Sequence, residues 1–499
     1  MVMDRVLLCL DSGTTAVKAA AFDGTGRMIA RAERANGALR RAGARVEQDM
    51  DATRDDAFAV LRDCVAQLQA PVAGLVITGQ GDGLWPVDAA GQPVGHALTW
   101  LDGRARGMAA ELGPELDAVQ AITGSRPTAA SASLQLRWLE RHEPERFARI
   151  AHALRLKEWL FLSLTGEVMG EPGAALPVWG NWRDSSFSEG VEQALGLGRG
   201  LALLPAFRPV GACRAGLRAE IGLPLGTPVL LGPGDVQSTL IGLGLGSRAG
   251  VARASIFGTS SIHACLHHDP AAMVDAPPGA MVQQFALGTG WLCFHPGFNG
   301  ATVLQHLARL GADLPQPAKP CWSGLILHPF FEPGGERAPW TDPHATGALI
   351  GLNAATTPAE IAWAGREALA FVARHSHAML GQSEGALSLG GGLAGDVHFA
   401  RFLATATGHA VERSPGSHAG LRGLAAIGAR FLLEEPASAI ADRWIGPPEE
   451  TVTPLDTAVV AYADRKYAVF AALIEAARPL WPALAALRAS AESLARRTE

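Results

Sequence analysis

The chain has 499 residues, which is more than one hydrophobic core usually holds, so two domains, or one domain with large insertions, are expected. Hydrophobic residues make up 48% of the chain, charged residues 18%, and the formal net charge is -6, as in ordinary globular proteins. The basic residues are nearly all arginines and are scattered along the chain, so the sequence predicts no nucleic-acid partner.

The cysteines are far apart and form none of the close pairs used by zinc sites or redox motifs, which favours buried, reduced thiols. They are Cys9, Cys64, Cys213, Cys265, Cys293 and Cys321. The short apolar run at the start of the chain is interrupted by charges and matches neither a signal peptide nor a membrane span. A cytoplasmic protein without membrane contact is therefore expected.

The first elements are predicted from turn signals and periodicity. Residues 5–35 alternate short apolar runs with glycine-containing turns, which predicts a three-stranded antiparallel meander. A helix follows over 51–70, with a stripe formed by Ala57, Leu61, Cys64, Val65 and Leu68, and then a buried strand, VAGLVITGQ. This order indicates an α/β domain.

A second set of elements begins near residue 228 and repeats this pattern. The segments PVLLGPGDVQSTLIGLGLG and ASIFGTSSIHACL again combine a strand, a glycine-rich turn and another strand, which suggests a weak internal duplication. Thr357 and Glu360 form a capping box, with Pro358 at the first helical position. Beyond that helix we expect the strand ALSLGGG, helices over about 396–407 and 419–433, and a helical tail in which Leu480, Trp481, Leu484 and Leu487 have packing spacings.

Two glycine-threonine turns are candidates for holding phosphate. The chain contains no GxxxxGK[ST] motif, so backbone N–H groups, hydroxyls and a divalent cation would have to do this work. Asp11-Ser12-Gly13-Thr14-Thr15 suits the task, and Asp11 could hold Mg²⁺ through waters. Gly258-Thr259-Ser260 is a turn of the same type. Taken alone, either string is equally compatible with an ordinary hairpin.

Asp235 follows an apolar strand within Gly232-Pro233-Gly234-Asp235. Phosphoryl transfer to an alcohol needs one carboxylate to accept the hydroxyl proton, together with positioning and electrostatic stabilisation. An aspartate in such a setting is also a common turn residue, so its neighbours along the chain must decide.

The ordered series of segments resembles the FGGY family of carbohydrate kinases. The matching strings are LDSGTTAVKAAAFD, EQDM, ITGQGDG, ALTWLDGRA, LKEWLFLSLTGE, GPGDVQSTLIGLG, FGTSS, GGERAPWTDPHATGALIGL and LSLGGGLAGD. The resemblance implies two ribonuclease-H-like, actin- and hexokinase-like ATPase domains of α/β class with an interdomain cleft. It divides the chain into an N-terminal domain over 1–245, a C-terminal nucleotide-binding domain over 246–440 and a helical tail over 441–499.

Roles for individual residues follow from the same resemblance. It assigns catalysis to Asp235, Mg²⁺ to Asp11 and Asp235, and the first phosphate loop to Ser12, Gly13, Thr14 and Thr15. It places Gly258, Thr259 and Ser260 in the second phosphate loop, and it places Gly390, Gly391 and Gly392 beside adenine and ribose.

The substrate side departs from better-known family members. Gln80-Gly81-Asp82-Gly83 occupies the substrate loop, where Asp82 suits two adjacent hydroxyls of an open-chain polyol or ketose. Trp100 is placed to stack on a carbon chain, and Asp102 and Arg104 to shape the pocket with Asp235. A purely structural Asp102–Arg104 pair near the hinge is an equally good interpretation.

The sequence therefore predicts an ATP- and Mg²⁺-dependent kinase of a small linear polyol or ketose, of erythritol or xylulose type, whose partner is that small molecule. Glycerol, ribulose and L-xylulose are alternative substrates. A non-catalytic sugar or nucleotide sensor, or an actin-like ATPase, would keep the same fold. Relatives often assemble as dimers or tetramers, and the analogy points to a homodimer.

Overall fold

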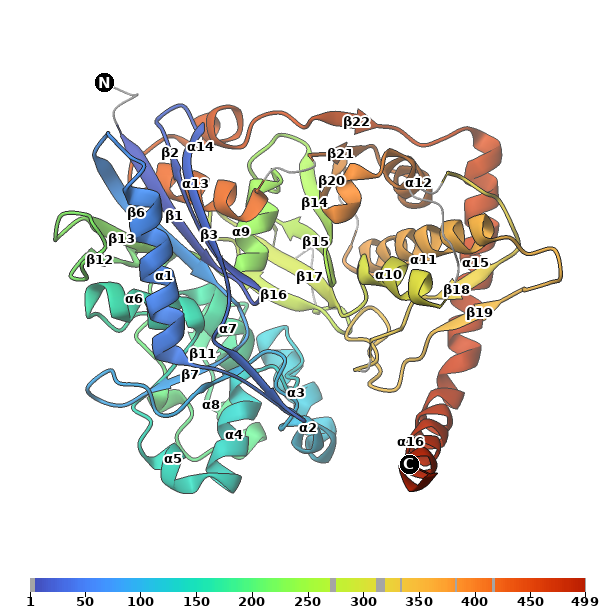
Figure 1. Cartoon of the computed structure of the whole chain (residues 1–499), viewed down its shortest axis with the longest axis horizontal. Coiled ribbons are helices and arrows are strands. Elements are labelled where there is room, and N and C mark those ends of the chain that lie inside the picture. Colours follow the sequence, from blue (N-terminus) through green and yellow to red (C-terminus); the bar gives the residue numbers. More distant parts are fainter. Residues whose placement is uncertain are drawn as a thin grey trace.

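The computed structural model describes residues 5–269, 275–310, 319–332, 334–381, 384–414 and 418–498. The chain forms two large mixed sheets that lie side by side with helices between and around them (Figure 1). The predicted α/β class with two domains is confirmed.

The first sheet grows from the predicted meander, which is confirmed. Its strands run in the order β12 (Arg214–Gly216), β13 (Pro228–Leu231), β6 (Val72–Gly79), β1 (Val6–Ser12), β2 (Ala16–Phe22), β3 (Met28–Ala35). β1, β2 and β3 are antiparallel neighbours, whereas β6 runs parallel to β1 and β13 runs parallel to β6. The three parallel strands therefore end at the same edge of the sheet.

Helices cover both faces of this sheet, which explains why β1 is apolar at nearly every position. Leu8 and Leu10 pack with α1 (Met50–Val65), whereas Leu7 and Cys9 face a core shared with α9 (Asp235–Gly242) and α13 (Ala419–Phe431). The predicted helix over 51–70 is thus confirmed but ends earlier, so Leu68 contacts the core from a turn beyond the helix.

A long insertion between β3 and β13 builds a smaller sheet and a helical layer with a core of their own. Its strands are β4 (Leu39–Ala42), β5 (Arg45–Gln48), β7 (Gly83–Val87), β8 (Ala97–Thr99), β9 (His152–Leu154), β10 (Gly180–Asn181) and β11 (Ser186–Phe187). Its helices are α2 (Arg106–Leu112), α3 (Pro114–Thr123), α4 (Ala132–His142), α5 (Pro144–Ala148), α6 (Leu156–Thr165), α7 (Pro172–Trp179) and α8 (Glu189–Leu195). Short 3₁₀ turns follow at Leu201–Leu203 and Val210–Ala212.

The second sheet repeats the plan of the first. Its strand order is β16 (Met281–Gln284), β17 (Trp291–Gly297), β15 (Ser261–His267), β14 (Val251–Phe257), β20 (Ala386–Gly391), β21 (Val411–Arg413), β22 (Glu450–Val452). The β14–β15 hairpin corresponds to β1–β2, and β20 runs parallel to β14 as β6 does to β1. The internal duplication suggested by the sequence is thus visible in the topology.

The helices of the second half include those that the sequence predicts. They are α10 (Thr302–Arg309), α11 (Pro358–Met379), the 3₁₀ turn Gly392–Gly395, α12 (Val397–Thr407), α13, α14 (Ala437–Ile440) and the π-turn Ala441–Ile445, with a side hairpin of β18 (Ile326–His328) and β19 (Ala348–Ile350). The capping box at Thr357 is confirmed, because its hydroxyl accepts from the Glu360 N–H and the Glu360 carboxylate accepts from the Thr357 N–H.

Helices α9 and α13 cross between the two sheets at glycines. A Cβ added to Gly242 would lie 1.8 Å from the Ala419 carbonyl oxygen, and one added to Gly423 would lie 1.8 Å from that of Ser238. The helix backbones therefore touch directly. This crossing belongs to a core that also contains residues of both large sheets, so it joins the two halves of the molecule.

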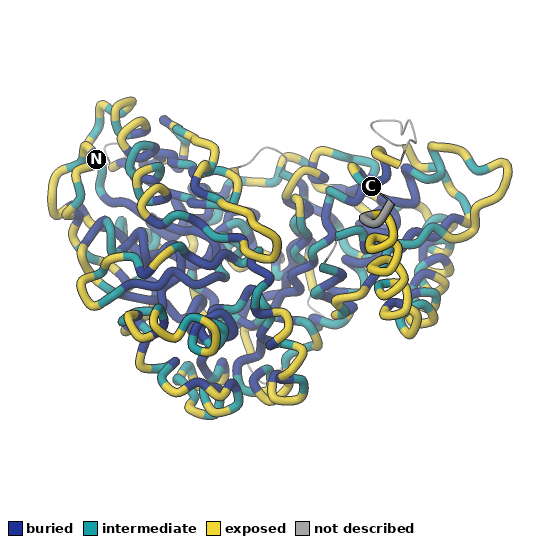
Figure 2. The backbone as a smooth tube through the Cα atoms, turned by 60° about the horizontal axis from the view of Figure 1, so that its bottom comes forward, coloured by how far each residue is buried: buried dark blue, intermediate teal, exposed yellow. Residues whose placement is uncertain are grey.

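The tail consists of α15 (Thr457–Ala477), a 3₁₀ turn (Arg478–Leu480) and α16 (Trp481–Thr498). By length and apolar composition alone, Thr457–Ala495 resembles a membrane span, yet α15 buries Phe470 and Ile474 in the core of the second half. Helix α16 projects from the body and is largely exposed (Figures 1 and 2). Only Trp481 of the predicted packing set is buried; the prediction is wrong for Leu480, Leu484 and Leu487, which are 60, 46 and 66% exposed.

The cysteines are all free in the structure, and five of the six are buried, as the sequence predicts.

Candidate functional site

Three acidic side chains gather where the parallel strands β1, β6 and β13 end. Asp11 lies near the end of β1 opposite Thr78 of β6, whose hydroxyl donates to the Pro233 carbonyl beyond β13 at 2.5 Å. Asp82 follows β6, and Asp235 is the first residue of α9. The charges of Asp11 and Asp82 both act on Asp235, so sequence positions more than 200 residues apart meet in one site.

Asp235 is half-buried and lies in an acidic setting. Its Oδ1 accepts a hydrogen bond from the Val236 N–H at 2.8 Å, and the Gly81 N–H also donates to the carboxylate. Burial, and then the charges of Asp11 and Asp82, raise the pKa of Asp235 from 3.8 to about 7. A carboxylate with this pKa can accept a proton near neutral pH.

Asp11 and Ser12 carry buried polar atoms without partners. Among the described residues, Oδ1 of Asp11 and the hydroxyl of Ser12 have no hydrogen-bond partner, and burial raises the pKa of Asp11 to about 6. A Cβ added to Gly420, at the start of α13, would lie 3.0 Å from Asp11 Oδ2, so α13 begins against this carboxylate. Helix N-termini present N–H groups and a positive dipole end, which suits phosphate.

The first glycine-threonine loop is the β1–β2 turn. It closes through the Gly13 N–H, which donates to the Ala16 carbonyl at 3.0 Å. The Thr14 hydroxyl accepts a hydrogen bond from the Trp100 indole N–H at 2.9 Å, while Thr15 is exposed at the tip. Trp100 is therefore tied to the predicted phosphate loop as well as lying near the predicted substrate side.

The second loop is the matching turn of the β14–β15 hairpin. Gly258 and Ser260 close it by a backbone hydrogen bond of 3.0 Å, and the side chain of Thr259 is exposed. The glycine run lies directly beside it, because Gly390 and Gly391 pair with Ile256 and Phe257 in the parallel sheet. Within the described residues, no hydrogen bond or ion pair links this turn to Asp11 or Asp235.

Only glycine fits at the end of β20. Gly391 has φ +82°, and a Cβ there would lie 2.3 Å from the Phe257 carbonyl oxygen. By contrast, a Cβ on Gly258 or Gly392 would meet nothing closer than 3.8 Å. The backbones of β20 and β14 are therefore in close contact at Gly391, whereas there is space beside Gly258 and Gly392. This space fits a nucleotide that approaches the backbone closely.

The side chains of the predicted substrate loop after β6 differ in the partners that they bind. The side-chain N–H₂ of Gln80 donates to the Gln48 side chain at 3.1 Å, while its Oε1 is buried without a partner. Asp82 Oδ2 lies 3.4 Å from Nη2 of Arg337, which comes from the second half of the chain. Arg337 was not anticipated from sequence, and its pairing means that Asp82 does not face the site as an isolated acceptor.

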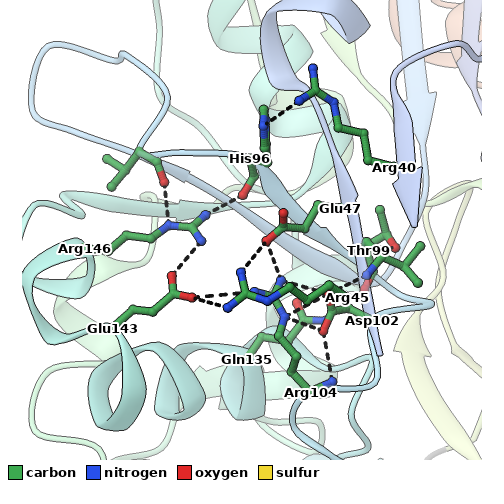
Figure 3. A network of polar contacts seen from close by, with 12 residues as sticks. Arg40, Arg45, Glu47, His96, Thr99, Asp102, Arg104, Gln135, Glu143 and Arg146 are labelled. Atoms are coloured by element: carbon green, nitrogen blue, oxygen red, sulfur yellow. Dashed lines mark hydrogen bonds and ion pairs between the residues drawn. The ribbon is translucent and has the colours of Figure 1, made fainter. Parts of the chain in front are cut away.

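Asp102 and Arg104 belong to a separate charge network (Figure 3). Asp102 accepts from the Val46 N–H at 2.9 Å and from two nitrogens of Arg104, which also binds Glu47 at 2.8 Å. Glu143 faces the same arginine at 3.7 Å. The arrangement is that of the structural ion pair, the alternative that the sequence left open.

A magnesium ion fits the acidic edge better than a metal with many protein ligands would. No group of three or more His, Cys, Asp or Glu among the described residues is arranged as a metal site. Mg²⁺ usually keeps several waters and binds one or two carboxylates plus substrate phosphates. The unpartnered Oδ1 of Asp11 and the raised pKa values of Asp11 and Asp235 suit a cation of this kind.

Two surface hollows lie away from this edge. One, of about 260 Å³, is lined by residues including Thr165 and Arg218, and the other, of about 300 Å³, by residues including His268 and Ala437. Neither hollow contains a predicted site residue.

Three residues near the site carried no usable sequence signal: Gly420, Arg337 and Arg155. Arg337 lies within GGERAPW, a segment of the FGGY-like pattern in which the sequence predicts no role for the arginine. Gly420 and Arg155 reach the site only because α13 and the β9–α6 junction are folded against it.

Comparisons with known proteins agree with this geometry. Residues 6–242 match the model of the FGGY family of carbohydrate kinases, N-terminal domain, and residues 254–432 match its C-terminal domain. An erythritol kinase from Brucella abortus (strain 2308) is 29% identical, over 96% of this chain and 98% of that protein. A xylulose kinase from Streptomyces coelicolor (strain ATCC BAA-471 / A3(2) / M145) is 30% identical, over 87% of this chain and 90% of that protein.

Solved structures show the same fold. A ligand-bound xylulose kinase from Lactobacillus acidophilus superposes with a TM-score of 0.84 at 18% identity, covering 96% of this chain and 100% of that one. A xylulose kinase from Brucella ovis gives 0.83 at 24% identity, covering 95% and 100%. The predicted two-domain fold is confirmed by these matches.

Proposed function

Because the chain belongs to the FGGY family of carbohydrate kinases, we propose that it transfers the terminal phosphoryl group of ATP to a hydroxyl of a small linear polyol or ketose, with Asp235 as the base. The observation that carries the proposal is the half-buried Asp235 carboxylate at the start of α9, beside Asp11 and Asp82. Kinase activity and dependence on ATP follow from the family; the residue roles and the substrate are proposed.

Asp235 would take the proton from the attacking hydroxyl. Two backbone N–H groups, from Gly81 and Val236, fix its carboxylate, and its pKa of about 7 places proton transfer near neutral pH. The hydroxyl oxygen then attacks the terminal phosphorus as the bond to the ADP oxygen breaks, and the proton remains on Asp235. In phosphoryl transfer most of the protein's contribution is positioning and electrostatic stabilisation.

The phosphates would lie between the two loops. They would be held by backbone N–H groups and hydroxyls of Ser12 to Thr15 and of Gly258 to Ser260. Adenine and ribose would lie beside Gly390 to Gly392. Mg²⁺ would be held by Asp11 and Asp235, and when bound it neutralises charge on the phosphates. Gln80, Asp82 and Trp100 would line the substrate side, and Asp102 and Arg104 would support that wall from behind.

The preferred substrates have roughly four or five carbons, of erythritol or xylulose type, because an acidic loop residue suits vicinal hydroxyls. The names of the relatives from Brucella abortus and Streptomyces coelicolor support the same range. ADP release, measured by a coupled assay across a polyol and ketose panel, tests this. Turnover with at least one such compound is expected, and failure of all of them would reject the substrate class.

Asp235→Asn tests the base. We expect turnover to fall by about two orders of magnitude or more, because the amide cannot accept the proton, while ATP binding is retained. Equal turnover in the variant would remove Asp235 from the mechanism. A sensor with this fold would bind without turnover, and an actin-like ATPase would hydrolyse ATP at a rate independent of sugar.

The remaining assignments complete the proposal. Residues 1–245, 246–440 and 441–499 would form the N-terminal domain, the nucleotide-binding domain and the tail. We place the enzyme in the cytoplasm, without nucleic-acid or membrane partners.

A homodimer is proposed with α16 as its candidate interface. Exposed Leu484, Leu487 and Leu494 recur along this projecting helix at intervals of three and seven, the spacing of a helix-pairing seam, and exposed Leu480 lies directly before the helix. Leu484→Glu with Leu487→Glu should convert a dimer into a monomer in light scattering. A wild-type monomer would refute the assembly.

A further inference from the structure

Arg155 lies at the junction of β9 and α6, beside the substrate loop. β9 pairs with β7, placing Leu154 opposite Trp85, and a Cβ on Gly79 would lie 3.0 Å from the side chain of Leu156. The residues on both sides of Arg155 thus contact the strands that flank the loop from Gln80 to Gly83.

The Arg155 side chain is almost fully buried yet lacks an ion pair. Its exposed fraction is 2%, its Nε has no hydrogen-bond partner, and none of the ion pairs among the described residues includes it. Burying an arginine in this way is costly unless something compensates the charge. The protein keeps it, so a partner from outside the chain is the natural explanation.

The other three buried charged side chains near Arg155 each have a hydrogen-bond partner. Lys157 donates to Glu171 at 2.8 Å, and the other oxygen of Glu171 accepts from the Gly173 N–H at 2.6 Å. Glu158 accepts the backbone N–H of Arg155 itself, at 2.8 Å. Lys157 and Glu171 therefore form an ion pair, whereas neither Glu158 nor Arg155 has an ion-pair partner among the described residues.

Burial lowers the pKa of Arg155, and the charges of Glu158, Asp82 and Glu171 oppose this shift, although none of the three carboxylates forms an ion pair with Arg155 in the described structure. Asp82 is engaged from the other side by Arg337, at 3.4 Å. The substrate loop is therefore flanked by two guanidinium groups, one from each half of the chain, and only one of them is paired.

We propose that Arg155 is a substrate-binding residue whose guanidinium donates hydrogen bonds to oxygen atoms of the sugar or polyol beside Asp82. The inference rests on the proposed function, because it concerns the same site. A guanidinium offers five N–H donors in a planar fork, which matches two adjacent oxygens of a linear polyhydroxy compound. Asp82 then accepts from the hydroxyls while Arg155 donates, so that both sides of the hydroxyl pattern are recognised.

The test compares Arg155→Met and Arg155→Lys with wild type in the full chain. Initial rates with erythritol and with D-xylulose give kcat and KM for the sugar and KM for ATP. We expect Arg155→Met to lower kcat/KM for the sugar by about 10- to 100-fold, with KM for ATP unchanged, because a hydrogen bond to a charged group is lost. Arg155→Lys should fall between, since an ammonium keeps the charge but not the fork.

Thermal unfolding separates binding from a structural role. Arg155→Met should unfold at the same or a higher temperature than wild type, because it removes a buried charge that has no partner. Arg248→Met is the matched control: that arginine is paired with Glu412 and donates to the Gly446 carbonyl, so its loss should lower Tm. A lower Tm for Arg155→Met, with normal sugar kinetics, would overturn the inference.

A binding readout keeps this test separate from the kinase proposal. The shift in Tm caused by erythritol or D-xylulose needs no turnover, and the shift seen with wild type should shrink in Arg155→Met. If wild type binds a sugar without phosphorylating it, and the shift shrinks in Arg155→Met, the kinase proposal fails and the Arg155 inference stands. If the sugar shift is equal in both proteins, the inference fails, whatever the activity; a wild type that responds to neither compound also refutes it for this substrate class.

Discussion

The Asp235 carboxylate shows how a residue with a proposed catalytic role can cost stability. Its pKa is raised from 3.8 to about 7, so ionisation favours the unfolded chain as pH rises through that range. The cost is complete above about pH 7 and absent below about pH 4. At roughly 1.4 kcal/mol per pKa unit it amounts to a few kcal/mol at most.

We therefore predict that Asp235→Asn unfolds at a higher temperature than wild type at about pH 8, and that the difference disappears near pH 4. Calorimetry across this range measures it. Asp184→Asn is the control, because hydrogen bonds with Ser186 lower the pKa of that exposed carboxyl and its loss should bring no gain at high pH. Equal Tm values for wild type and Asp235→Asn at pH 8 would contradict the raised pKa.

Local sequence indicates candidate residues that lie at a turn. It does not indicate residues whose position near the site depends on contacts between distant parts of the chain. The sequence predicts roles for Asp11 and Asp235 because each follows an apolar run and lies within two residues of a glycine. Arg155 looks like an ordinary solvated arginine in RLKEW, and its burial against the Asp82 loop depends on β9 pairing with β7.

At the scale of elements, the crossing of α9 and α13 has no tolerance for a side chain. Gly423→Ala would place a methyl group 1.8 Å from the Ser238 carbonyl oxygen, so the helices must separate. Overpacking of this kind costs about 1–3 kcal/mol or more, and we expect lower Tm and lower kcat, because the crossing joins both halves.

Gly107→Ala is the matched control for this prediction. Gly107 lies in α2 with nothing within 4 Å of an added Cβ, so alanine should be neutral or slightly stabilising through helix propensity. If Gly423→Ala behaves like Gly107→Ala in unfolding and in turnover, the close crossing is not required.

The tail shows that the spacing of apolar residues does not predict their burial. In the sequence, Leu480, Leu484 and Leu487 have the spacing of a packed helix face. The 3₁₀ turn Arg478–Leu480 instead directs α16 away from the body, and these leucines are exposed. Periodicity indicates that a helix has an apolar face, but not what covers it.

At the scale of the whole molecule, the two halves differ in how they should respond to acid. The second half buries three histidines close together: Ser255 Oγ lies 3.0 Å from His263 Nδ1 and 2.9 Å from His377 Nε2, and His295 stands opposite His263 on the next strand. Burial lowers the pKa of His263 to about 3 and of His295 to about 4, and holds that of His377 well below its usual value. Neighbouring His263, and then Arg253 and His409, lower the pKa of His377 further.

Neutral buried histidines make the second half sensitive to acid. The unfolded chain takes up protons below about pH 6.5 while the folded one does not, so stability is complete above that value and falls as pH drops towards 4. We predict that Tm falls between about pH 7 and pH 5, and that His377→Gln, which can keep a hydrogen bond to Ser255, reduces the fall. His344→Gln, at an exposed position, should unfold with the pH dependence of wild type. Hydrogen exchange should locate the acid-induced loss of protection in β14 and β15 rather than in β1 and β6. Equal loss in both pairs of strands would mean that the buried histidines are not its cause.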